Sequence, residues 1–325
     1  MNLQESFYSK KSTMAGLAFA SLLFVCIAYS NHFNNGFEFD DYHTIVNNEY
    51  IRDIKNLPLF FTDIKYFGTN PGNQGYRPML VSLNAIDYWL AGELNPAYFH
   101  AHIFISYIAL LVLFFIFFNK IFDFTAKNER NKFLALLATV FFSVHTSNAE
   151  TINYICQRSD MGSTLWIIAS LLLYMSPKTK KYFLYLIAIL LAIGTKETGA
   201  TAGLMIFFYA LFFEGGVSLS ELLMFKKLKN VFAALKRAFP ALLASFGFFL
   251  FCQKYFFTAA PVIAAPDAPN ALNYYGTQCV VIAHYIGNFI IPLDLSADPD
   301  FTIYESLLDR RVLLAFVLLV SLIAI

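Results

Sequence analysis

Long apolar runs recur along this sequence, and no other feature restricts its fold as strongly. A helix that crosses a bilayer needs about 20 mostly apolar residues. Nine runs approach that length, at 13–30, 99–122, 132–147, 161–176, 182–195, 198–214, 233–257, 276–292 and 312–325. The sequence therefore predicts an all-α polytopic membrane protein with about nine or more transmembrane helices.

The composition supports lipid as a solvent for much of the chain. Hydrophobic residues make up 58% and charged residues 14% of the 325 residues, whereas ordinary globular chains are about 45–50% apolar and about 25% charged. One soluble core cannot hide this much apolar surface. The net charge of +1 gives no basic footprint for nucleic acid. No residue set has metal-ligand spacing, so we expect no cofactor, although a divalent metal stays open.

Lysine and arginine orient the predicted spans, because cytoplasmic segments of membrane proteins are enriched in both. With the N-terminus inside, most of the 23 basic residues fall on the cytoplasmic side. Residues 31–98 then form a large first exoplasmic loop. We expect interfacial helices in this loop at 76–92 and at 56–64, which lie in the membrane interface or cover the end of the bundle.

The expected helix at 76–92 has an apolar face at helical spacing. That face holds Met79, Leu80, Leu83, Ile86, Trp89 and Leu90. Asn84 and Asp87 fall elsewhere on the helical wheel. The segment is too short and polar to span a membrane, and it is amphipathic enough to lie in the membrane interface.

Charged and polar residues gather at the predicted exoplasmic ends of the spans, where charge is costly and is commonly functional or paired. The set comprises Asp40, Asp41, Arg77, His145, Glu150, Arg158, Asp160, Lys196 and Glu197. Each also has an ordinary reading: the aspartates as a solvated turn or a helix cap, Lys196 and Glu197 as a tight turn, and His145 as a bundle histidine. Their shared side and depth favour a functional site.

These residue types suit one kind of chemistry. Two adjacent carboxylates disfavour joint ionisation, so one pKa is expected to be raised, which suits a general base. Arg158, Lys196 and Arg77 are suited to binding a phosphate at the lipid boundary. Such a pocket fits a lipid-linked phosphosugar attacked from the aqueous side, with the phosphate leaving on the lipid.

Five segments carry a family resemblance in order along the chain. They are "FDDYHTIVNNEYI" (39–51), "YRPMLVSLNAIDYWLAGELNPAYFH" (76–100), "HTSNAETINYICQRSD" (145–160), "TKETGAT" (195–201) and "PLDLSADPDF" (292–301). The set resembles the transmembrane O-mannosyltransferases that target cadherins, and their bacterial relatives. Thr146, Gln157 and Ile103 depart from the family pattern, which bears on the acceptor and the sugar.

The resemblance implies a GT-C-like glycosyltransferase domain over residues 1–325, with the natural protein continuing into a C-terminal region. It implies inverting transfer of a sugar, mannose in the family, from a polyprenyl or dolichyl phosphate to a Ser or Thr hydroxyl of a protein. The implied roles are Asp40 as base and Asp41 as partner, in either order; Arg158 as main phosphate ligand, assisted by Lys196 and Arg77; Glu150, Asp160 and Glu197 as orienting acids; and His145 as a pocket member. Residues 258–275 are a candidate lid.

Two other functional classes stay open. A transporter or flippase of lipid-linked or anionic substrates would line the middle of the membrane with polar residues, whereas span centres such as "LLVLFFIFF" are apolar. A non-catalytic GT-C-like scaffold is the other class. The expected location is a bacterial inner membrane with a periplasmic site, or the endoplasmic reticulum membrane in a eukaryote.

Overall fold

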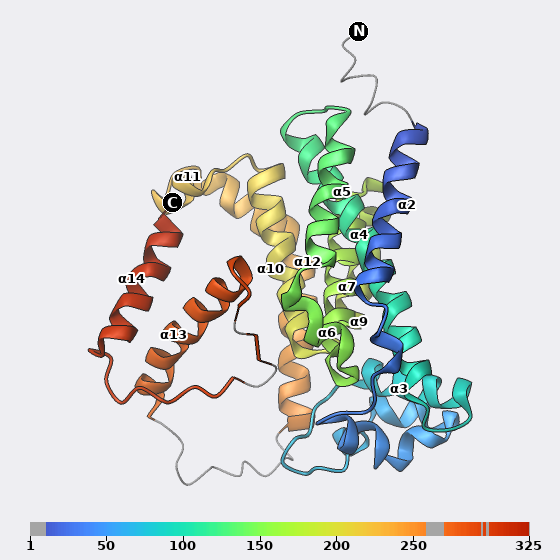
Figure 1. Cartoon of the computed structure of the whole chain (residues 1–325). Coiled ribbons are helices and arrows are strands. Elements are labelled where there is room, and N and C mark those ends of the chain that lie inside the picture. Colours follow the sequence, from blue (N-terminus) through green and yellow to red (C-terminus); the bar gives the residue numbers. More distant parts are fainter. Residues whose placement is uncertain (1–10, 258–269, 294, 297–298, 325) are drawn as a thin grey trace. The chain divides into compact units, whose positions relative to one another are not determined.

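The computed structural model describes residues 11–257, 270–293, 295–296 and 299–324. The regular structure of these described residues is helical throughout, without a strand (Figure 1). The chain divides into two compact units. Unit 1 comprises residues 1–145 and 151–261, and unit 2 comprises residues 146–150 and 262–325.

The described part of the chain has a helix at each of the nine predicted positions. In unit 1 these are α2 (Lys11–Ala28), α4 (Pro96–Thr125), α5 (Arg130–Ser143), α7 (Arg158–Met175), α9 (Leu184–Thr195), α10 (Thr201–Tyr209) and α12 (Leu228–Cys252). In unit 2 they are α13 (Ala271–Ile290) and α14 (Arg310–Ala324), which pack against each other. The shorter helices α6 (Ala149–Asn153), α8 (Pro177–Lys181) and α11 (Leu219–Leu223) lie in the connections.

Three described segments are long and apolar enough to cross a membrane: Lys11–Asn34, Pro96–Thr125 and Leu228–Phe256. Their exposed side chains include large apolar groups such as Phe19 on α2 and Ile105 on α4, both more than 65% exposed. Surfaces of this kind are stable in lipid and unfavourable in water. The chain is therefore a membrane protein.

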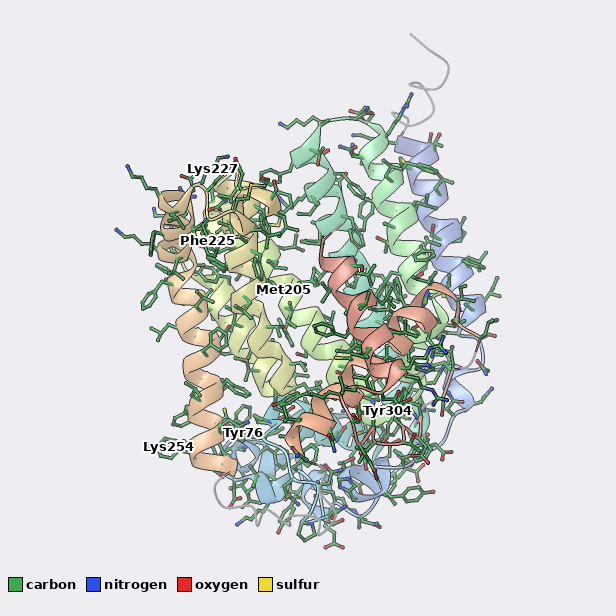
Figure 2. All side chains as sticks on the ribbon, turned by 90° about the vertical axis from the view of Figure 1, so that its left-hand side faces the viewer. Tyr76, Met205, Phe225, Lys227, Lys254 and Tyr304 are labelled. Carbon is green, nitrogen blue, oxygen red and sulfur yellow. The ribbon has the colours of Figure 1, made fainter. Side chains whose placement is uncertain are left out.

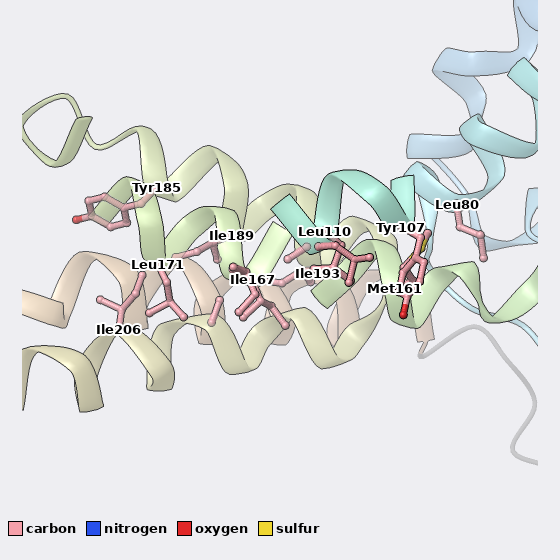
Figure 3. Close-up of a cluster of buried hydrophobic side chains, with 14 of the residues drawn as sticks. Leu80, Tyr107, Leu110, Met161, Ile167, Leu171, Tyr185, Ile189, Ile193 and Ile206 are labelled. Carbon is pink, nitrogen blue, oxygen red and sulfur yellow. The ribbon is translucent and has the colours of Figure 1, made fainter. Parts of the chain in front are cut away.

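Apolar side chains fill the middle of the unit 1 bundle, where α7 packs against α9 and α4, and α10 packs against α12. Figure 3 shows Leu110, Ile167, Ile189 and Ile206, one from each of α4, α7, α9 and α10, among the side chains of this core. Ile189 is fully buried, and burying such a side chain stabilises the fold by about 1.5–3 kcal/mol.

Short helices of the first loop lie at the end of the bundle where α2 stops. They are the π-helical turn η2 (Tyr42–Val46), the 3-10 helices η3 (Glu49–Arg52), η4 (Ile54–Phe61) and η5 (Ile64–Tyr66), and α3 (Pro78–Ala91). The element predicted at 56–64 is thus mostly a 3-10 helix, η4. Pro78 starts α3 at a position that needs no N–H donor, and Gly92 ends it at a φ of +73°, where a side chain would be strained.

The polar side chains of α3 face the interior of unit 1. The buried residues of this helix include Leu80, Asn84 and Asp87, whereas Trp89 and Leu90 from the apolar stripe are exposed. The helix turns its polar side chains inwards because Arg158 of α7 pairs with both of them.

Different residues surround the two ends of α12 (Figure 2). Phe225 and Lys227 precede the helix at one end, and Tyr76 and Lys254 lie at the other. There the Tyr76 ring stacks on Phe256, with ring centroids 3.8 Å apart, and its hydroxyl donates to the Phe61 carbonyl at 3.1 Å. This contact attaches the first loop to the far end of α12.

The candidate lid, 258–275, falls largely outside the described residues. Its last residues, 270–275, belong to the start of α13, where the Asn270 side chain accepts a hydrogen bond from the Leu272 backbone at 3.0 Å. Asn270 is therefore a helix cap, and this stretch is helix rather than an open loop.

Gly203 sets the close approach of α10 to α12. A Cβ atom added there would lie 2.6 Å from Ser245 Oγ and 2.9 Å from the Ala241 carbonyl oxygen. We expect Gly203→Ala to lower the free energy of unfolding by about 1–3 kcal/mol through overpacking. Gly16→Ala on α2 is the matched control, because no atom lies within 4 Å of the added methyl. Equal thermal midpoints for Gly203→Ala and wild type would contradict the prediction.

Candidate functional site

Asp41 joins the first loop to the segment that precedes α7. Its carboxylate is fully buried and accepts two backbone hydrogen bonds, from Glu38 at 3.0 Å and from Cys156 at 2.8 Å. Burial raises the pKa of the Asp41 carboxyl to about 6, while the two backbone donors and the Arg158 charge lower it and the neighbouring Asp40 adds little. Cys156 precedes Arg158 by two residues, so the aspartate pair lies beside the start of α7.

Asp40 is the accessible member of the pair, with its side chain 51% exposed. Its Oδ1 lies 3.3 Å from His43 Nε2 and accepts a hydrogen bond from Asn73 Nδ2 at 3.4 Å. Its backbone N–H donates to the Tyr154 hydroxyl at 2.8 Å. Asp41 therefore fixes the first loop through buried backbone hydrogen bonds. Asp40 exposes its carboxylate, which His43 and Asn73 orient.

The turn that separates the two environments is strained. Phe39 has a φ of +43°, a left-handed conformation that costs a bulky residue roughly 1–3 kcal/mol. Its ring packs edge-on against Tyr154, with centroids 5.9 Å apart. Such strain persists only where surrounding contacts fix it, and here the Tyr154 ring and hydroxyl supply two of them.

Arg158 is buried at the first residue of α7 and is 3% exposed. Its two terminal nitrogens donate to the Asp87 carboxylate and to the Asn84 side-chain oxygen of α3. Asp87 also lies 2.6 Å from His102 Nδ1 of α4. The guanidinium therefore joins α7, α3 and α4, and its buried Nε–H has no hydrogen-bond partner among the residues that the structure describes.

A cavity of about 160 Å³ adjoins this network. Arg158, His102, Ser106 and Thr195 supply its polar atoms, and the other lining side chains are apolar, Trp166 among them. A guanidinium among the lining residues of a mostly apolar cavity suits the anionic head of an amphipathic ligand.

The other two predicted phosphate ligands are each paired with a predicted orienting acid. Arg77 donates to both oxygens of Glu197, at 3.2 and 3.1 Å, and Lys196 pairs with Asp160. Both cationic side chains are about one-fifth exposed. Arg158 and Asp160, two residues apart on one helix, pair with different partners.

The remaining two predicted residues lie in different units. His145 follows α5 in unit 1, with its ring 5.5 Å from that of Phe141. Glu150 belongs to unit 2 and lines a cavity of about 250 Å³ with His284 and Asn288 of α13. In the described residues, no group of three or more His, Cys, Asp or Glu side chains is arranged to hold a metal ion.

Sequence reasoning missed several residues that contact the predicted ones. They are Tyr154, His43 and Asn73 around Asp40, and Asn84, Asp87 and His102 around Arg158. His43 carried a signal, because it stands three residues after Asp40 on a short helical turn. Asp87 carried another, since a carboxylate on a helix this apolar calls for a buried partner.

The raised pKa of Asp41 predicts how stability depends on pH. Between about pH 4 and pH 6 the folded state holds a proton that the unfolded state releases, so stability falls as the pH rises through this window. The loss is of order 3 kcal/mol at most. We expect thermal midpoints at pH 4.5 and 7 to differ less in Asp41→Asn than in wild type, whereas the exposed-site control Glu49→Gln keeps the wild-type difference. Equal pH dependence in all three proteins would rule out this assignment.

Comparisons with known proteins find relatives that match part of this chain, and those described below share one kind of name. No family model matches the chain, and no solved structure matches it. The chain is 30% identical over 167 residues to protein O-mannosyl-transferase TMTC4 of Mus musculus, covering 49% of this chain and 22% of that protein. It is 29% identical over 206 residues to human TMTC1, covering 58% and 22%, and 25% identical over 158 residues to human TMTC3, covering 47% and 16%.

The matched stretches span about a fifth of the length of these curated relatives. Each relative is named a protein O-mannosyl-transferase. The likenesses therefore support, at family level, the resemblance that the five sequence segments carry, and they favour a glycosyltransferase over a transporter.

Proposed function

We propose that this chain is the membrane-embedded catalytic part of a glycosyltransferase with a GT-C-like arrangement of about nine or more membrane helices. It transfers a sugar, mannose by analogy with its relatives, from a polyprenyl or dolichyl phosphate to a Ser or Thr hydroxyl of a protein on the exoplasmic side. The observation that carries the proposal is the placement of the aspartate pair beside the start of α7, with Asp40 exposed and Asp41 buried.

Asp40 is the base in this proposal. Its exposed oxygen accepts the proton of the acceptor hydroxyl as that oxygen bonds to C1 of the sugar. The bond from C1 to the phosphate oxygen breaks, and the phosphate leaves on the lipid with the electron pair. His43 and Asn73 orient the Asp40 carboxylate, and Asp41 positions it by fixing the loop to the Cys156 backbone.

The three cations stabilise the leaving phosphate in this proposal. Arg158 lines the small cavity with a buried charge, and Arg77 and Lys196 present partly exposed charges held by Glu197 and Asp160. Fixed donors act strongly at a low-dielectric boundary, because they need not reorganise as charge develops.

The apolar core argues against a transport path. The side chains that meet in the middle of unit 1, such as Leu110, Ile167 and Ile189, are hydrocarbon (Figure 3), whereas transporters bind substrate near the membrane midplane with polar groups. The charged pairs lie instead at one end of the bundle.

The test is transfer of label by the purified full-length protein. The protein, in a mild detergent, is incubated with radiolabelled polyprenyl-phosphate mannose and a Ser- and Thr-containing peptide. We expect labelled peptide, and none from the same peptide with Ala at each Ser and Thr. Absence of transfer under conditions where the protein remains folded would overturn the proposed activity.

A further inference from the structure

A long apolar cavity lies between α2, α4 and α5, away from the aspartate pair. It has a volume of about 440 Å³, and its lining includes Ala18 of α2, Leu111 and Phe115 of α4, and Leu136 of α5. We call this cavity the α2 slot. Of the residues in α2, Val25 alone is buried, so this helix leaves a gap towards its neighbours instead of packing against them.

The α2 slot is closed at one end. Tyr29 and Tyr107 both donate hydrogen bonds to the Ser143 carbonyl oxygen, at 3.1 and 2.7 Å, and their rings pack edge to face. Ser143 and Val25 line the slot just beside this cluster. The closed end is the end from which the chain leaves α2 for the first loop, so a lipid with its head group at Asp40 cannot enter there.

The other end of the α2 slot is basic. Lys132, on the first turn of α5, lines it together with Met14 of α2, and its side chain is 55% exposed. Lys11 begins α2 at the same end. Glu129 lies 3.8 Å from Lys132 with both groups exposed, and such loose surface pairs are weak. Lys132 can therefore still attract an anion at this end of the α2 slot.

The α2 slot has the length and chemistry of a lipid site. From Met14 to Val25 the helix rises about 16 Å, and the slot of about 440 Å³ follows it over that length. Its lining is almost wholly apolar, and the lysine at its open end is exposed. This combination matches a ligand that joins an extended hydrocarbon chain to an anionic head group.

We propose that the α2 slot binds one acyl chain of an anionic phospholipid, with the phosphate of its head group at Lys132. The hydrocarbon lining excludes polar ligands, the closed end fixes the direction of the chain, and the lysines select negative charge. This site is independent of the transferase proposal, because no residue of the aspartate or arginine clusters lines it.

The test is native mass spectrometry of the full-length protein taken from nanodiscs that contain equal amounts of phosphatidylglycerol and phosphatidylcholine. We expect one retained phosphatidylglycerol per chain. Lys132→Gln removes about 1 kcal/mol of attraction to an anionic lipid, so its retention should fall about fivefold. Ala18→Phe fills the slot and should abolish retention, and Leu136→Trp provides a second filling variant.

Two controls separate the slot from general lipid contact. Leu23→Phe enlarges an exposed residue of α2 that does not line the slot, and Lys226→Gln removes an exposed lysine elsewhere. Both should retain lipid as wild type does. Wild-type retention in Lys132→Gln and in a folded filling variant, or equal retention of phosphatidylcholine, would overturn the proposal.

Discussion

Replacing Asp40 by Asn is expected to lower sugar transfer by about 10²–10⁴-fold, the range that a positioned general base contributes. Asn keeps the shape of the side chain but cannot take the acceptor proton. Because the Asp40 side chain is half exposed, the fold should tolerate the change, with the free energy of unfolding within about 0.5 kcal/mol of wild type. Initial rates with labelled donor, together with thermal unfolding, measure both quantities.

Asp63→Asn is the matched control, because Asp63 is a comparably exposed aspartate of the same loop, and it should transfer at the wild-type rate. His43→Ala should reduce the rate less than Asp40→Asn does, since His43 only orients the carboxylate. Full activity in the double variant Asp40→Asn, Asp41→Asn would exclude the base assignment.

Replacing Arg158 by Met is expected to have the largest effect on stability. The guanidinium is buried and neutralises Asp87, which is 1% exposed. Removing one member of a buried pair leaves an uncompensated charge and costs about 3–5 kcal/mol. We expect a strong fall in the thermal midpoint of the detergent-solubilised protein.

The double variant Arg158→Met, Asp87→Leu tests the cause. With both charges gone, much of the lost stability should return, since an apolar pair of similar volume is often no worse than a buried ion pair. The exposed arginine of the first loop gives the control: Arg52→Met, with its weak partner Glu49 at 3.9 Å, should change stability by less than about 1 kcal/mol. A wild-type midpoint for Arg158→Met would contradict the structural role of the buried pair.

The positions of the helices were predictable from the sequence, because they depend mainly on the length of each hydrophobic run. Each of the nine predicted segments contains a helix in the part of the chain that the structure describes. Whether each crosses a membrane remains a prediction, since three segments meet the length and hydropathy requirement. The rotation of α3 was not predictable, because the hydrophobic wheel ignores a partner 71 residues away, the distance along the chain from Asp87 to Arg158.

The candidate site was predictable in outline and not in detail. The charged residues at the expected helix ends included Asp41 and Arg158. In the structure, the Cys156 backbone N–H just before Arg158 donates a hydrogen bond to Asp41. The different burial of Asp40 and Asp41 depends on the left-handed turn at Phe39, and a phenylalanine gives no sign of that conformation in a sequence. The catalytic and phosphate-binding roles of these residues remain proposals.

The pairing of each cation with an acid has a consequence for selectivity. In the proposed phosphate site each cation already has a counterion: Arg158 pairs with Asp87, Arg77 with Glu197 and Lys196 with Asp160. An incoming anion must therefore compete with resident counterions, and free inorganic phosphate has little to offset that competition. An anion attached to a long hydrocarbon tail gains the needed free energy by partitioning into the bilayer. Under the proposed function, the site would therefore bind a lipid-linked phosphate in preference to free phosphate in water.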